Sequence, residues 1–311
     1  MNKLRLILLT PKRRDIIKLT QEYYLFFGER LRVLRSERGL TQKELAKDAC
    51  HRTQVVHIET CQHNPSLKLV EELAKKLNYS PEELTLMIIN PNYTFSKQFA
   101  IILEDLYFKK QYNKIYGLLQ PHRFHGGLKS FEWQRKIQYY EALKYFYNKK
   151  YLQVLEILEE TLLELNDKKI LLPIDLRILN LVRLINLKTK KFDEEKLIRK
   201  KIEEQFKFIE DKAYIIPVYI SLINFYIKEK DFKKALNYIT EAQHIIETFH
   251  FYHYKPYLSF YKAVINYYKT NDINSFLESF RIIKLICEEL NISFLLKEFN
   301  KYLKDYNIKT N

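Results

Sequence analysis

The strongest constraint on the fold is a short joint that recurs along the second part of the chain. Each copy is a basic or polar run that ends in a bulky residue, and a helix of about four turns can follow it. The joints are Lys110-Gln111-Tyr112, Lys149-Lys150-Tyr151, Lys190-Lys191-Phe192, Lys230-Asp231-Phe232 and Asn271-Asp272-Ile273, with spacings of 39, 41, 40 and 41 residues. A period in this range predicts a solenoid of stacked helical hairpins.

The fourth unit indicates which kind of hairpin repeats. Its aromatic, leucine, tyrosine and small residues fall where a tetratricopeptide repeat has them: Tyr219, Leu222, Tyr226, Ala235 and Ala242. The period is nearer 40 than the usual value of about 34, and the proline that usually ends a unit is missing, so a HEAT-like array is the alternative. Only five glycines and eight prolines occur in 311 residues, which favours long helices. We therefore expect an all-α protein with a right-handed α-solenoid of about five tetratricopeptide-like hairpins.

The segment from Leu40 to Leu67 has a different pattern, which is typical of a helix-turn-helix. Thr41 and Glu44 have the spacing of a capping box at the start of the first helix. We expect the apolar side chains of the two helices to be buried: Leu45, Ala46, Val55 and Ile58. The second helix then exposes a row of hydrogen-bonding side chains: Arg52, Thr53, Gln54 and His57. Such a row is what a helix needs to read a DNA major groove.

These patterns predict the domain organisation. Residues 1–27 form an N-terminal extension, 28–80 a helix-turn-helix domain, 81–93 a linker helix and 94–305 the repeat domain. The basic cluster Lys12–Arg14 in the extension can neutralise phosphates as a DNA-touching arm. A frayed helix or a misplaced start is the other interpretation of this segment.

Composition limits the class of function. The net charge of +15 suits an anionic partner such as DNA. Residues 1–90 hold 16 basic and 11 acidic residues, and the rest of the chain holds 37 basic and 27 acidic residues. Because the excess of positive charge is spread over both parts, it does not locate the DNA site. Three cysteines and no secretory signal favour a cytoplasmic protein, and the opening apolar run is too short for a membrane span. Glycine-rich phosphate loops and catalytic motifs are absent from the sequence. We expect no enzyme activity, no cofactor and no metal.

The residues GLTQKELAKDACHRTQVVHIE resemble the helix-turn-helix of PlcR-like members of the Rgg/Rap/NprR/PlcR/PrgX family of peptide-sensing bacterial regulators. The likeness continues at Ser96–Phe99, Tyr112–Tyr116 and Gln138–Ala142. It implies a homodimeric transcription regulator, which we expect to be an activator, that binds two-fold-related sites in double-stranded DNA. It also implies that the repeat domain binds a short signalling peptide of quorum-sensing type and that a linker helix spans Pro81 to Ile89.

The resemblance assigns roles within the helix-turn-helix. Gln42 would contact a phosphate and Arg52, Thr53 and Gln54 would reach base edges, while Arg35 and Glu59 would form a structural pair. The chain departs from the family at His57, where PlcR-like sequences carry arginine, and at Cys61, where a glycine usually ends the helix. A zinc site is the competing interpretation of five residues, Cys50, His51, His57, Cys61 and His63, but their spacings do not match those of a zinc finger.

In the repeat domain the resemblance places peptide-binding side chains at Lys110, Asn180, Ser221 and Ser259. The family has a second asparagine in place of Ser221 and a glutamine in place of Ser259, so both side chains reach less far here. Tyr139, Tyr140 and Tyr261 are groove candidates that we expect to be core. Two alternatives remain: a protein-interaction module of the Rap type, and a phage-type repressor with a different ligand.

Overall fold

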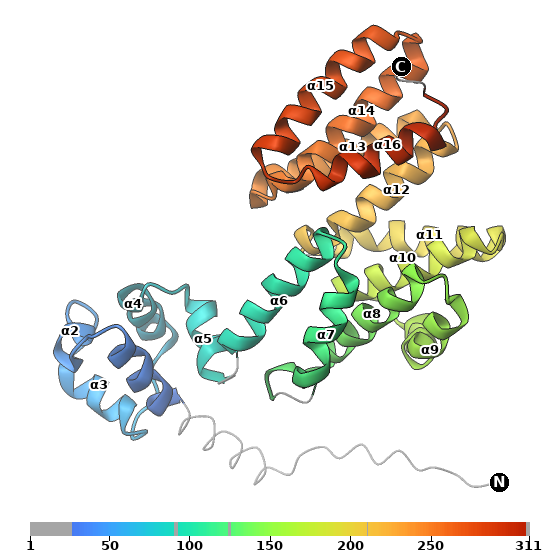
Figure 1. Cartoon of the computed structure of the whole chain (residues 1–311). Coiled ribbons are helices and arrows are strands. Elements are labelled where there is room, and N and C mark those ends of the chain that lie inside the picture. Colours follow the sequence, from blue (N-terminus) through green and yellow to red (C-terminus); the bar gives the residue numbers. More distant parts are fainter. Residues whose placement is uncertain (1–26, 90–92, 124–125, 210, 309–311) are drawn as a thin grey trace, which may run out of the picture. The chain divides into compact units, whose positions relative to one another are not determined.

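The computed structural model describes residues 27–89, 93–123, 126–209 and 211–308, and all regular structure in these ranges is helical (Figure 1). They divide into two compact units, the first of residues 27–89, 93–104 and 126–128, and the second of residues 105–123, 129–209 and 211–308. The division falls inside one helix, α6 (Tyr93–Phe108). Residues 1–26, including the expected arm at Lys12–Arg14, lie outside the described residues.

The first unit is a bundle of short helices. A helix over 27–37 precedes α2 (Gln42–Ala46), α3 (Arg52–Glu59), α4 (Leu67–Leu77) and α5 (Pro81–Ile89), the segment expected as the linker helix. Side chains cap three of these helices: Thr41 and Glu44 form the expected capping box of α2, and His51 and Ser66 accept from the first turns of α3 and α4. The caps explain why the helices begin where the sequence predicts.

One apolar core holds this unit together. The four side chains expected to be buried, Leu45, Ala46, Val55 and Ile58, all lie in it, with apolar residues of the helix over 27–37 and of α4 and α5. At about 25 cal/mol per Å² of buried apolar surface, this burial is what stabilises helices too short to persist alone.

The second unit contains the expected helical hairpins. After the end of α6, it consists of α7 (Tyr112–His122), α8 (Phe131–Tyr147), α9 (Tyr151–Asp167), α10 (Pro173–Lys188), α11 (Phe192–Gln205), α12 (Ile216–Lys228), α13 (Phe232–Phe249), α14 (Lys255–Thr270), α15 (Ile273–Glu289) and α16 (Phe294–Asp305). Helices α7, α9, α11, α13 and α15 each begin at the last residue of a joint, as predicted. Each joint therefore separates the two helices of a pair.

The joints share one backbone conformation that the sequence pattern did not reveal. Lys110, Lys149, Lys190, Lys230 and Asn271 all adopt left-handed conformations, with φ between 55° and 62°. At four of the joints the next amide donates back to a carbonyl of the preceding helix, for example from Lys191 to Asn186 at 2.8 Å. This is the Schellman arrangement, which bonds carbonyls at a helix end that would otherwise lack partners.

The first helices of the hairpins stack on one another. Helix α10 contacts both α8 and α12, and α12 contacts α14, while each also packs against its own second helix (Figure 1). The five side chains that suggested a tetratricopeptide repeat are all buried, and so are Tyr139, Tyr140 and Tyr261, as expected. Helix α16 ends the stack, where Phe299 lies parallel to Phe260 of α14 at 4.5 Å between ring centroids. No helix among the described residues is both long and apolar enough to span a membrane.

Candidate functional site

The exposed start of α3 is the first candidate site. Arg52, Thr53 and Gln54 are exposed, and His57, one turn further along, is half-buried. The Thr53 hydroxyl and main-chain amide both contact Nδ1 of His51, the residue that caps the helix. Thr53 is engaged with the cap, whereas the side chains of Arg52 and Gln54 have no hydrogen-bond partner among the described residues.

A network behind this surface fixes α3 to its neighbours. The Arg35 guanidinium donates to both carboxylate oxygens of Glu59, at 2.5 and 3.0 Å, and also to the carbonyl oxygen of Leu40 at 2.7 Å. Its bond to Glu59 raises the pKa of Arg35 above the ordinary value, so the guanidinium stays charged. The side-chain amide of Gln42 donates to the same carboxylate at 2.8 Å. Gln42, expected only as a phosphate contact, therefore also links α2 to α3.

The end of α3 has an unusual residue at its left-handed position. Cys61 has a φ of 61°, in the left-handed region that favours glycine. The space next to it is provided by Gly28, where an added Cβ would lie 2.1 Å from the Ile58 carbonyl oxygen and 2.8 Å from the Cys61 sulfur. The glycine that this packing requires is thus on the neighbouring helix.

Among the described residues, no three His, Cys, Asp or Glu side chains are grouped to hold a metal ion. His57 and His63 lie near each other, with ring centroids 5.5 Å apart. Cys50 packs beside the core, and burial raises the pKa of its thiol. The five residues of the zinc interpretation are therefore not gathered into one site.

The second candidate site is a pocket inside the solenoid. It has a volume of about 190 Å³ and is lined by the end of α6, by α7, α8, α10, α12, α14 and α16, and by Tyr254 just before α14. Three of the expected peptide-binding residues, Lys110, Asn180 and Ser221, line it together. Ser259 is half-buried on α14 and is not part of the lining. The pocket thus brings three of the four candidates to one place.

One side of the pocket is organised by Glu298, which the sequence analysis missed. Its carboxylate forms an ion pair with Lys110 and accepts hydrogen bonds from the hydroxyls of Tyr257 at 2.8 Å and Tyr302 at 2.9 Å. Burial raises the pKa of both tyrosines well above the ordinary value, so both remain donors. Glu298 therefore joins the last helix to the first joint across the pocket.

The other side is organised by Arg183, which is fully buried. It donates to Asn180 Oδ1 at 3.1 Å, to Ser221 Oγ at 2.6 Å and to Glu195 Oε1 at 3.2 Å. Burial lowers the pKa of Arg183, and the bond to Glu195 opposes that shift. An arginine within the apolar run of α10 was the one sequence signal that could have revealed this network.

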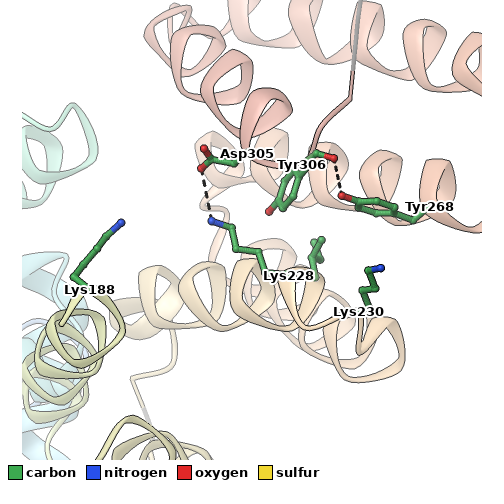
Figure 2. A pocket seen from close by; sticks show the side chains of 7 residues that line it. Lys188, Lys228, Lys230, Tyr268, Asp305 and Tyr306 are labelled. Carbon is green, nitrogen blue, oxygen red and sulfur yellow. Dashed lines mark hydrogen bonds and ion pairs between the residues drawn. The ribbon is translucent and has the colours of Figure 1, made fainter. Parts of the chain in front are cut away.

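A separate hollow of about 490 Å³ lies where α10 and α12 end (Figure 2). Lys188, Lys228 and Lys230 line it, together with Tyr268, Asp305 and Tyr306. Lys228 Nζ is 3.6 Å from an Asp305 carboxylate oxygen, and the Tyr268 hydroxyl donates to the Tyr306 carbonyl at 2.8 Å. Lys188 and Lys228 lie in the last turns of α10 and α12, where a positive charge interacts favourably with the helix dipole. The presence of these two lysines therefore needs no ligand to explain it.

The two units define a class of fold, a helix-turn-helix joined to a solenoid of helical hairpins. Residues 27–87 match the family model of a helix-turn-helix domain. No curated protein sequence matches the chain.

Solved structures match almost the whole described chain. PlcR from Bacillus thuringiensis, in complex with the peptide PapR7 and DNA, is 19% identical, with a TM-score of 0.68 over 88% of this chain and 99% of that chain. ComR from S. thermophilus, in complex with DNA and its signalling peptide ComS, is 18% identical, with a TM-score of 0.62 over 90% and 99% of the chains. PrgX in complex with cCF10 is 15% identical, with a TM-score of 0.55 over 90% and 99%. The chain therefore has the fold of these regulators, and the expected resemblance is confirmed at that level.

Proposed function

We propose that this protein is a peptide-responsive, DNA-binding transcription regulator. It acts in the cytoplasm as a homodimer, activates transcription and has no enzyme activity. The observation that carries the proposal is the exposed start of α3, because Arg52 and Gln54 present exposed hydrogen-bonding groups, without partners in the described part of the chain, on a helix fixed from behind. The shared fold supports it, since PlcR and ComR were each solved with both a peptide and DNA.

On the DNA side, α3 enters the major groove. Gln54 can pair bidentately with adenine and Arg52 with guanine. Thr53, in the same turn, and His57, one turn further along α3, contribute to the same surface. Gln42 retains a second amide hydrogen for a phosphate while the first bonds Glu59. A homodimer presents two such helices to half-sites about one helical turn apart.

On the peptide side, the pocket in the solenoid is the receptor site. Lys110, Asn180 and Ser221 supply polar contacts on an otherwise largely aromatic lining. Binding of a signalling peptide there changes the arrangement of the hairpins and so the separation of the two α3 helices in the dimer. The peptide is the regulator's effector in this proposal.

Selection of binding sites from a random duplex pool by the full chain tests the DNA half of the proposal. We expect a two-fold-related consensus. Gln54→Ala should then relax the preference at one base pair per half-site, at a cost of about 1–3 kcal/mol, while Gln42→Ala should weaken all duplexes about equally. Failure to enrich any sequence would instead favour a protein-interaction module.

Gel-shift titration of the selected duplex, with and without a peptide that binds the chain, tests the regulatory half. The proposal predicts a change in affinity or in the footprint when the peptide is added. Equal affinity and equal footprints in both states would remove the switch and leave a constitutive DNA-binding protein, as a phage-type repressor with another ligand would be.

A further inference from the structure

Two hollows flank the carboxyl end of α10, and both include residues of the joints. One is the hollow of about 490 Å³ in Figure 2, and the other, of about 580 Å³, is lined by the last turn of α10 and the start of α9. Six lysines line the two hollows: Lys149, Lys150, Lys188, Lys191, Lys228 and Lys230. Asp305 is the only acidic residue among the described residues of these linings, and none of these residues lines the inner pocket. We call this positive surface the lysine edge.

Five of the six lysines have no charge partner. Lys228 Nζ is 3.6 Å from Asp305, but the other five ammonium groups form no hydrogen bond or ion pair with any described residue, as Figure 2 shows for Lys188 and Lys230. Favourable interaction with the helix dipole accounts for only two lysines of the edge, the ones in the last turns of α10 and α12.

Two of the remaining lysines oppose the helix dipole. Lys150 and Lys191 are the N-cap residues of α9 and α11, and neither side chain caps its helix. In α9 the first turn contains no acidic residue that would offset the charge. A positive charge at the amino end of a helix is unfavourable, so the stability of the fold does not account for these lysines.

The hollow next to α9 combines the charges with apolar side chains. Leu152 is 77% exposed beside the two lysines that precede α9, and Leu155 and Ile185 lie in the same lining. Leu152 gains from burial and the lysines gain from carboxylates, so one partner that supplies both fits this surface best. A nucleic acid fits it less well, because Tyr151, the one aromatic ring among the described residues of this lining, is half-buried and offers little surface for base stacking.

We propose that the lysine edge is a docking surface for an acidic segment of another protein, which packs a large apolar side chain on Leu152 and pairs its carboxylates with the lysines of the two hollows. Charge complementarity supports this partner, because the five unpaired ammonium groups are all on exposed residues. The apolar contact supplies affinity, and the ion pairs accelerate association and fix the orientation. The surface is separate from the DNA and peptide sites of the proposed function and goes beyond them.

Two charge variants of the full-length protein test the acidic partner. The edge variant, Lys149→Glu with Lys150→Glu, reverses the charge next to α9 and should melt at the same or a higher temperature, because acids at the start of a helix are favourable. The matched control, Lys169→Glu with Lys196→Glu, makes the same change of charge at exposed positions outside both linings. A displayed pool of random peptides is selected on each protein. Sequences that the wild type and the control retain and the edge variant loses should be rich in aspartate and glutamate around a large apolar residue.

A second pair of variants tests the apolar contact. The selected peptide, labelled with fluorescein, should bind about tenfold more weakly to Leu152→Ser than to the wild type, because a large apolar side chain then loses its contact. Leu163→Ser is the matched control, since Leu163 is 65% exposed on the same helix and lies outside both linings. Added sodium chloride should weaken binding to the wild type, because it screens the ion pairs.

Several results would overturn the inference. Identical peptide pools for the edge variant and its control, or lost sequences that are not acidic, would remove the acidic partner. Equal effects of Leu152→Ser and Leu163→Ser would remove the apolar contact. Weaker binding of a random-sequence duplex by the edge variant alone, with no acidic peptide selected, would assign the surface to nucleic acid, and loss of a dimer in light scattering would assign it to a second copy. Each result leaves the proposed DNA and peptide sites untouched.

Discussion

Glu59 connects α3 to the rest of the first unit, and its replacement by glutamine gives a quantitative test of that role. The carboxylate is 1% exposed and accepts two hydrogen bonds from Arg35 and one from Gln42. Glu59→Gln removes the negative charge and replaces one carboxylate oxygen by an amide nitrogen. That nitrogen is a donor, and it would face the donor groups of Arg35 and Gln42. Loss of one partner of a buried ion pair costs about 3–5 kcal/mol.

The expected loss is smaller here because Arg35 is 12% exposed and keeps its bond to the Leu40 carbonyl. We therefore expect the free energy of local unfolding around α3 to fall by about 2–3 kcal/mol. At about 1.4 kcal/mol for each factor of ten, amides of α3 should exchange their hydrogens about 30-fold to 150-fold faster.

Hydrogen–deuterium exchange of the full-length protein measures this directly. Peptides from α14, in the second unit, serve as the internal control and should exchange at unchanged rates. The double variant Arg35→Leu with Glu59→Leu removes both charges and should recover most of the loss. Exchange in α3 that rises less than threefold in Glu59→Gln, or that rises more in the double variant than in the single one, would refute the argument.

Three further predictions follow from particular residues. Lys190→Gly relieves a left-handed conformation with a φ of 62° and should stabilise the chain to thermal unfolding by up to about 1 kcal/mol. The control is Lys191→Gly, which should destabilise the chain because the φ of −89° at that position is accessible to any residue. Gly28→Ala places a Cβ against the Ile58 carbonyl and should abolish binding to the selected duplex, while Gly117→Ala, which meets nothing within 4 Å, should bind normally. Burial, reinforced by the bond to Glu203, raises the pKa of Tyr226 from 10.0 to about 12. The contribution of its neutral hydroxyl to stability is therefore complete below pH 10 and is lost as the pH rises toward 12. In urea unfolding, the difference in unfolding free energy between the wild type and Tyr226→Phe should shrink across that range, and a constant difference would contradict the prediction.

The fold was predictable because local patterns determine it. The joints ended at the residues where α7, α9, α11, α13 and α15 begin, since each joint ends one helix and starts the next. The capping box at Thr41 fixed the start of α2 in the same way. What the pattern did not reveal was the left-handed lysine in four of the joints, because that conformation is usual for glycine or asparagine and not for lysine.

The candidate sites were predictable only in part. Exposure of Arg52 and Gln54 follows from helical periodicity, because Val55 and Ile58 occupy the opposite face. The partners of Glu298 and Arg183 lie on other helices, and their contacts depend on how the hairpins stack. No spacing in the sequence encodes such contacts, so the sequence analysis found Lys110, Asn180 and Ser221 but not the residues that orient them.

Helix α16 lines the pocket but belongs to none of the hairpins. It follows the last complete hairpin and contributes Glu298 and Tyr302 to the pocket, so a chain shortened after α15 would retain every hairpin and lose part of the pocket lining. If the proposed function is correct, mutations in these final residues should alter which peptide is bound and leave DNA binding by the first unit unchanged. Sequence divergence among relatives that respond to different peptides should therefore concentrate near the carboxyl end.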